Sequence, residues 1–148
     1  MPLDDQKDLS RRAIQMWASD NSDAPETIIA QDYINHQESD VEGGVSGRSL
    51  KAWKDLVGGY HSAFSNSKVK VLMQIAEDDL VAFWATYSGI QDGPMGPYPA
   101  TSKRMELDFA GMHRIADDKI VETWVIWDNL TGLTQLGHFP PAPPEVAE

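Results

Sequence analysis

Four histidines are the side chains of this sequence best suited to bind a metal ion or to move a proton near neutral pH. They are His36, His61, His113 and His138, and no H-x-H or H-E-x-x-H pair occurs among them. No carboxylate accompanies them at a spacing typical of zinc ligands, so we expect no metal site. Cysteine is absent from the sequence, which excludes disulfide bonds, thiolate nucleophiles and cysteine-based zinc sites.

His113 stands in a stretch where apolar and polar residues alternate as they do in a β-strand. Its parity is shared by apolar residues of the same stretch, namely Met105, Leu107, Phe109 and Ile115. The alternation therefore predicts an imidazole on an apolar face. Such a histidine either contacts a substrate or is a buried residue hydrogen-bonded to a neighbour. His61 lies on the apolar face of a predicted helix and fits a core or interface histidine better.

Motifs for nucleophilic or nucleotide chemistry do not occur in the sequence. There is no G-x-S-x-G nucleophile turn, no P-loop and no dinucleotide-binding fingerprint. The acidic segments 77–79 and 117–118 lack the pattern of a calcium loop, and we expect them to be solvated turns. We therefore expect neither a cofactor nor a covalent nucleophile.

The charge balance limits the partners of the protein. Twelve Lys and Arg residues stand against 23 Asp and Glu residues, which gives a formal net charge of −11. A surface of that sign repels a phosphate backbone, so nucleic acid is not expected as a partner. No apolar run approaches the ~20 residues of a membrane span, and residues 1–12 lack the apolar segment of a signal peptide. We expect a cytoplasmic protein without membrane contact.

Helical periodicity characterises the first part of the chain. A first helix within residues 1–20 has an apolar face made of Leu9, Ala13, Met16 and Trp17. Pro25 suits the first turn of a second, shorter helix that ends near Ala30. A third helix is expected over 50–64, although Gly58 and Gly59 in it each cost about 1 kcal/mol relative to alanine.

From Ser67 onward the period changes to that of β-strands. Long strands are expected from Ser67 to the turn at 77–79 and over 80–91, 103–116 and 120–129, after a short strand over 32–37. The glycine-rich segments 38–47 and 92–99 are expected to be loops. Apolar residues occupy both faces of the long strands.

Helices followed by a run of antiparallel strands are typical of an α+β protein, and 148 residues argue for one domain. An antiparallel sheet with two apolar faces must be covered on both sides. We expect the three helices to cover one face and a second copy of the chain to cover the other. The sequence thus predicts a homodimer that associates through the outer face of the sheet.

The carboxy-terminal strands carry the motif that is most specific for a family. His113-Arg-Ile-Ala-Asp-Asp-Lys-Ile-Val-Glu-Thr-Trp124 is followed by Asp128 and by Leu130-Thr-Gly-Leu-Thr-Gln-Leu-Gly137. Tyr33-Ile-Asn-His36, Phe64 and the loop 93–101 precede it in the expected order. These stretches resemble the SnoaL-like polyketide cyclases, also called ester cyclases. The resemblance implies a nuclear transport factor 2-like fold, in which a cone-shaped, curved antiparallel sheet wraps around three N-terminal helices. That domain would comprise residues 1–137, with 138–148 as a Pro-rich tail.

The resemblance also implies a chemistry. In the polyketide cyclases an acidic residue near the end of the last long strand is the acid/base, and Asp128 occupies that position. The implied reaction is a cofactor-independent intramolecular aldol condensation of a polyketide-like or other small hydrophobic carbonyl compound. His113 would orient or polarise the substrate carbonyl, and His36 would lie at the rim of the pocket. Asp128 shares its parity with Trp124 and Ile126, so an apolar surrounding is expected unless Asp128 only ends the strand in a turn.

Aromatic residues are numerous enough to form a pocket for a planar molecule. The candidates for substrate binding are Trp17, Tyr33, Trp53, Tyr60, Trp84 and Trp124. Aromatic residues at helical and strand spacing also fill ordinary cores, and the sequence leaves both interpretations open.

Other functions are compatible with the same cone. An isomerase or a dehydratase would also need one group that transfers a proton, and it would look the same in sequence. An epoxide hydrolase of this architecture would need an Asp-Arg-Asp cluster, and we cannot assign residues of this sequence to one. A non-catalytic small-molecule-binding or dimerisation module is the alternative from a different functional class.

Overall fold

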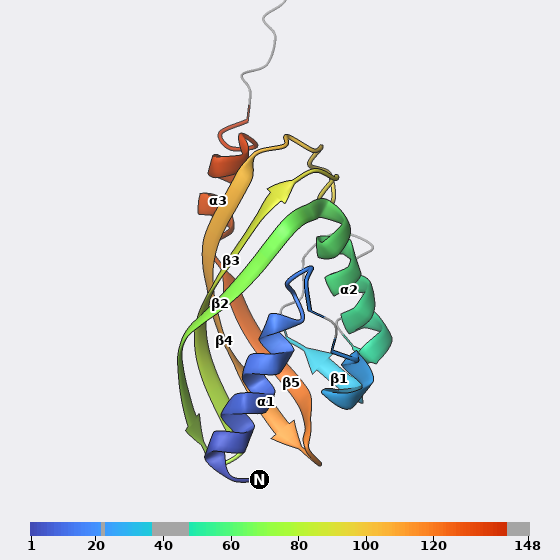
Figure 1. The fold of residues 1–148 in the computed structure, drawn as a ribbon, viewed down its shortest axis with the longest axis vertical. Coiled ribbons are helices and arrows are strands. Elements are labelled where there is room, and N and C mark those ends of the chain that lie inside the picture. The colour runs from blue at the N-terminus through green and yellow to red at the C-terminus, as the bar shows by residue number, and fades with distance from the viewer. Residues whose placement is uncertain (22, 37–47, 142–148) are drawn as a thin grey trace, which may run out of the picture.

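A computed structural model describes residues 1–21, 23–36 and 48–141 of the chain (Figure 1). In chain order the elements are α1 (Leu3–Gln15), the 3-10 turn η1 (Pro25–Thr27), β1 (Ile29–Asn35), α2 (Ser49–Ala63), β2 (Phe64–Glu77), β3 (Leu80–Gln91), β4 (Arg104–Ala116), β5 (Lys119–Trp127) and α3 (Asn129–Leu136). The predicted loop 38–47 and most of the Pro-rich tail lie outside the described residues.

The strands form one sheet in the order β1-β5-β4-β3-β2. Strands β2 to β5 pair antiparallel, whereas β1 pairs parallel with β5 at one edge. Figure 1 shows the sheet curving around α1, and α2 packs against β1 on the same side of the sheet. The predicted α+β class, a curved sheet wrapped around helices, is confirmed.

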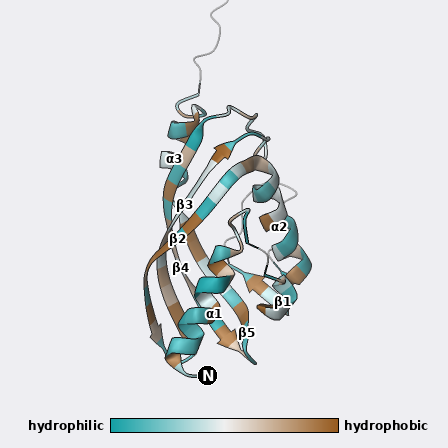
Figure 2. Ribbon diagram, in the orientation of Figure 1, coloured by the Kyte–Doolittle hydropathy of each residue, from teal (hydrophilic) through white to brown (hydrophobic). Residues whose placement is uncertain are grey.

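Helix α1 forms because its apolar residues fall on one face, where Leu9, Ala13 and Ile14 are buried. Its visible side is largely hydrophilic in Figure 2. Asp4 in the first turn and Arg12 in the last turn have the charges that the helix dipole favours at each end. The helix therefore has one face for the sheet and one for water.

Two of the helical predictions need correction. The second helix, expected from Pro25 to Ala30, is a single 3-10 turn, because Ile28 and Ile29 are buried and join the edge of the sheet beside β5. The sequence analysis also missed α3, which Asp128 caps at its start and which Gly137 ends in the left-handed conformation. Among the described residues, two α-helices therefore precede the long strands and a third follows them.

The bounds of the strands agree closely with those expected. Strand β3 spans Leu80–Gln91 as predicted, and β4 begins at Arg104, one position after its expected start. Strand β2 begins earlier than expected, at Phe64, directly after α2. Strand β1 covers 29–35 instead of 32–37, and β5 ends at Trp127 because the chain turns into α3.

Both faces of the sheet carry apolar side chains, as the sequence indicated. From β3 and β4 the inner face buries Val81, Phe83, Ala85, Tyr87, Met105, Leu107 and Phe109. The outer face exposes Leu72, Met73, Ile75, Trp84, Met112 and Ile126. The helices cover only the inner face.

A β-bulge in β5 decides which of its residues face inward. The register shifts between the pair Arg114–Glu122 and the pair Ile115–Ile120. Ile120 and Thr123 are therefore both buried, although an odd separation would place them on opposite faces of a regular strand. The bulge thus brings a polar residue, Thr123, to the inner face.

Candidate functional site

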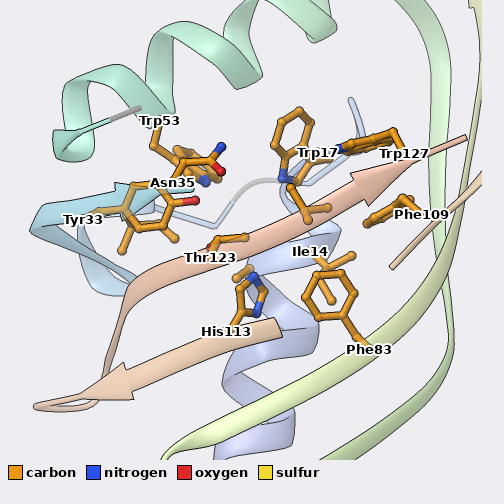
Figure 3. Close-up of a pocket in the computed structure, with 13 residues that line it drawn as sticks. Ile14, Trp17, Tyr33, Asn35, Trp53, Phe83, Phe109, His113, Thr123 and Trp127 are labelled. Carbon is orange, nitrogen blue, oxygen red and sulfur yellow. The ribbon is translucent and has the colours of Figure 1, made fainter. Parts of the chain in front are cut away.

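A pocket lies between α1, α2, β1 and the inner face of the sheet (Figure 3). Its cavity volume is about 30 Å³. Its walls are mainly aromatic and include Trp17, Trp53, Phe83, Phe109 and Trp127. Pockets with a mainly apolar and aromatic lining typically hold small, largely apolar molecules.

Two stacked rings form a flat part of the wall. The rings of Phe109 and Trp127 have centroids 4.2 Å apart and planes within 14° of parallel. Trp17, two residues after the end of α1, contacts Trp127 across a centroid distance of 5.5 Å. Trp127 points inward because it shares the parity of Val125 and Thr123 after the bulge. Such a wall suits a planar apolar molecule.

The polar residues of the pocket lie toward the other end of it in Figure 3, away from the stacked rings. Asn35 of β1 pairs in register with Thr123 of β5, and Thr123 pairs in turn with His113 of β4. All three side chains are buried and line the pocket. The sheet register therefore sets three polar side chains in one row across three strands.

His113 is held in this row by one hydrogen bond and by ring contacts. Its Nδ1 lies 2.8 Å from Oγ of Ser10 on α1, and its ring centroid lies 4.8 Å from that of Phe83. Burial lowers the pKa of His113 to about 3, so the imidazole is uncharged at neutral pH. The predicted apolar face is confirmed by the burial of His113. The residue bonds to a neighbour and also lines the pocket, and its contact with a substrate stays a prediction.

Tyr33 adds a hydroxyl group beside this row. It lies on β1 with the same parity as Asn35, and both face the pocket. Burial raises the pKa of Tyr33 to about 12, so the phenol keeps its proton at neutral pH. A protonated phenol and an uncharged imidazole can both donate a hydrogen bond to a carbonyl oxygen.

Sequence analysis missed Ser10, Asn35 and Thr123 as residues of the site. Each is a polar residue with at least one apolar or aromatic neighbour on the same strand face or helical face. That pattern was the available signal for Ser10 and Asn35. For Thr123 the bulge obscures it, because a regular strand would give Thr123 a different face relative to Ile120.

Asp128 lies outside the set of residues that line the pocket. It is the N-cap of α3, where its carboxylate accepts hydrogen bonds from the backbone N–H of Thr131 at 3.2 Å and from Thr131 Oγ1 at 2.6 Å. The prediction that Asp128 has apolar surroundings is wrong. Asp128 is exposed, and Ile126, two residues earlier on the same side of the chain, faces outward and is 79% exposed. The catalytic role that the sequence suggests for Asp128 stays a prediction.

His36, Trp84 and Trp124 also lie away from the pocket, contrary to the expectation that they contribute to it. The ring of His36 stacks on Trp124 with centroids 4.7 Å apart, and His36 Nε2 lies 2.8 Å from Oε2 of Glu122. Trp84 is exposed on the outer face, where its Nε1–H donates to Asp108. Strand alternation explains the correction, since Phe83 and Thr123, the neighbours of these tryptophans in sequence, point inward.

The other predicted aromatic residues are on the inner side of the sheet. Trp17, Tyr33 and Trp53 line the pocket. Tyr60 does not line it, but its ring stacks on Trp127 with centroids 6.0 Å apart and supports the wall from behind. Half of the predicted aromatic set is therefore in direct contact with the cavity.

The remaining histidines bond within the fold. His61 Nε2 lies 3.0 Å from the backbone oxygen of Met16, and His138 Nε2 lies 2.8 Å from Oε1 of Gln91. Within residues 1–21, 23–36 and 48–141, no group of three or more His, Asp or Glu side chains is placed to hold a metal ion. None of the helices in that part of the chain is long and apolar enough to cross a membrane.

Comparison with known proteins adds a family to this geometry. A family model described as SnoaL-like polyketide cyclase matches residues 7–136. This range includes α1 from residue 7 onward, with Ser10, all strands of the sheet, and α3 to its last residue. No curated protein sequence matches the chain at a significant level.

Solved structures share the fold over nearly the whole chain. TsrD from Streptomyces laurentii has a TM-score of 0.79 at 19% identity, covering 94% of this chain and 99% of its own. IdmH from Streptomyces antibioticus has a TM-score of 0.75 at 26% identity, covering 89% and 98%. A Catenulispora acidiphila protein with a ketosteroid isomerase-like fold has a TM-score of 0.68 at 16% identity, covering 92% and 97%. The predicted nuclear transport factor 2-like cone is confirmed.

Proposed function

The chain belongs to the SnoaL-like polyketide cyclase family, and we propose that it catalyses a cofactor-independent intramolecular aldol cyclisation of a small hydrophobic carbonyl compound. The observation that carries this proposal is an uncharged, buried imidazole, that of His113, in a pocket whose walls are mainly aromatic. A carbonyl group placed at this end of the pocket would meet hydrogen-bonding groups from Asn35, Tyr33 and His113. The stacked rings at the other end suit the apolar remainder of the molecule.

The proposed reaction balances without a cofactor. A base takes a proton from an activated methylene group, and the electron pair left behind forms an enolate. The enolate carbon attacks a second carbonyl carbon of the same molecule, a C–C bond forms, and the π pair of that carbonyl moves to its oxygen. The oxygen then takes up a proton, so that substrate and product are isomers. His113 is proposed to hydrogen-bond the oxygen on which the negative charge develops.

Asp128 is proposed as the base that takes the methylene proton. Family resemblance supports this role, and so does its position directly after Trp127, whose ring lines the pocket. A substrate longer than the pocket would extend past that ring toward the carboxylate. The contact of Asp128 with Thr131 would then have to break or be shared during the reaction.

Asp128→Asn is a clean test of this base. Asparagine caps a helix about as well as aspartate, so α3 should keep its N-cap while the charge is lost. We expect turnover of β-dicarbonyl esters that carry a second, remote carbonyl group to fall by about 100-fold or more, with little change in binding. Product formation by NMR and binding by calorimetry measure the two effects. Turnover that survives Asp128→Asn would show that the proton acceptor is another group.

A non-catalytic binding protein is the second candidate function. One observation favours it: the described residues that line the pocket include no carboxylate, and burial leaves His113 a weak base. A binding protein would hold the same planar carbonyl compounds without converting them. In that case the wild-type protein and both variants, Asp128→Asn and His113→Gln, would convert none of the compounds. Of the two substitutions, only His113→Gln would weaken binding.

A further inference from the structure

We propose that Ser10 is a positioning residue that holds His113 with its proton on Nε2, so that the ring presents a hydrogen-bond donor to the pocket. The significance of this arrangement for catalysis rests on the proposed function, whereas the arrangement itself does not. Neither the sequence motif nor the family match singles out Ser10.

The placement of Ser10 allows it to act only through His113. Ser10 is fully buried on α1, and its Oγ lies 2.8 Å from Nδ1 of His113. It does not line the pocket, whereas His113 does. A bound molecule would therefore meet the imidazole and not the serine. Because Nδ1 bonds to Ser10, Nε2 is the ring nitrogen left for a molecule bound in the pocket that His113 lines.

The protons of this pair can be assigned by counting donors and acceptors. If Nδ1 carried the proton, it would donate to Ser10 Oγ, and the buried serine hydroxyl would need a different acceptor. No other hydrogen bond of that hydroxyl exists among the described residues. A buried donor without a partner costs about 1–3 kcal/mol. If the hydroxyl instead donates to Nδ1, both groups are satisfied and the single proton of the neutral ring lies on Nε2.

This assignment determines what His113 can do for a bound carbonyl compound. An Nε2–H group donates a hydrogen bond, and it has no free lone pair with which to accept a proton. Burial prevents a second protonation near neutral pH, because the pKa of His113 lies near 3. His113 is therefore a stabiliser of a developing oxyanion and not a general base, in keeping with a separate base such as Asp128.

NMR of protein labelled with ¹⁵N-histidine tests the assignment without any substrate. His113→Gln identifies the signals of this ring among the four histidines. At neutral pH we expect wild-type His113 to be protonated on Nε2, with the Nδ1 signal shifted by the bond from Ser10. Ser10→Ala should abolish that shift, and Ser10→Thr, which keeps a hydroxyl, should restore it. A ring protonated on Nδ1 in the wild type, or an Nδ1 signal unchanged in Ser10→Ala, would overturn the proposal.

Turnover separates this proposal from the proposed function. If both hold, Ser10→Ala lowers turnover by about tenfold in the wild-type background, because the donor is no longer oriented. In the His113→Gln background Ser10→Ala should then have no further effect, since it acts only through the imidazole. An equal loss in both backgrounds would contradict a positioning role. If the wild type shows the expected NMR shifts but no turnover, the assignment of the proton to Nε2 holds and the proposed catalytic function is wrong.

Discussion

The chemistry of the site at the scale of single residues depends on the burial of His113. Its hydrogen-bond partner Ser10 is neutral and the adjacent Phe83 ring is apolar, so neither contact compensates a positive charge. Water cannot do so either, because the side chain is buried. The neutral ring is therefore strongly favoured in the folded chain, while the unfolded chain leaves the same ring free to titrate in water.

This difference predicts a pH dependence of stability. The pKa of His113 is about 3 in the folded chain, below the ordinary value of 6.5 that applies after unfolding. Below about pH 6.5 the unfolded chain binds a proton that the folded chain does not bind, so stability is lost as the pH falls. The loss approaches about 1.4 kcal/mol per pH unit. Urea unfolding between about pH 7 and pH 5 should show a steeper decline for the wild type than for His113→Gln. Parallel profiles of the two proteins would contradict the buried, neutral ring.

At the scale of elements, helix α2 contains two glycines whose positions would have room for a larger side chain. A Cβ atom at Gly58 or at Gly59 would meet no other atom within 4 Å. At Gly111 in β4, by contrast, a Cβ would lie 2.1 Å from the backbone oxygen of Trp124. Gly111 is thus required by the close approach of β5, whereas the two helical glycines only reduce the stability of α2.

Alanine substitutions should show this difference directly. We expect Gly58→Ala and Gly59→Ala each to raise the free energy of unfolding by about 1 kcal/mol, the difference in helix propensity. Gly111→Ala is the matched control and should destabilise the protein strongly, because backbone atoms cannot yield to the new methyl group. The midpoints of urea unfolding measure all three. A destabilised Gly58→Ala would mean that α2 needs the freedom of a glycine there.

At the scale of the whole molecule, the outer face of the sheet is a surface that none of the described helices covers. Two apolar rows cross the four long strands: Met73, Trp84, Ala110 and Ile126 in one row, and Ile75, Ala82, Met112 and Trp124 in the next. Ile126 is 79% exposed and Ile75 is 69% exposed. A continuous apolar surface on so acidic a protein marks an interaction site. We propose that a second copy of the chain covers it, since one sheet face can pack on its own copy around a two-fold axis.

The mass of the protein in solution tests this homodimer. Light scattering at micromolar concentration should give twice the 16.4 kDa of one chain. Ile126→Glu should shift the mass toward that of one chain, because the glutamate would be buried without a partner in the interface. Leu56→Glu is the matched control, since Leu56 is an exposed leucine of α2, 41% accessible and away from the outer sheet face. A wild-type mass of one chain would refute the dimer.

The sequence by itself determined the features that depend on neighbours along the chain. Two-fold alternation specified the bounds of β3, Leu80–Gln91, and placed His113 on the apolar side of β4. The tight turn at Asp117 and Asp118 also sets His113 opposite the segment that contains Thr123. Helical spacing likewise placed α1 and α2, because the buried face of each repeats every three to four residues.

Only the tertiary structure decided what meets His113 and what does not. Asn35 enters the polar row through the parallel pairing of β1 with β5, and Ser10 reaches the imidazole from a helix 103 positions away in the chain. From the sequence, Asp128 could end a strand inside a pocket or cap a helix outside it. Because the chain continues into α3, Asp128 is the N-cap of that helix. Alternation along one strand divides its side chains into two faces, but it does not determine which face points toward the cavity. A single bulge in β5 and the packing of distant segments therefore determined which side chains face the cavity.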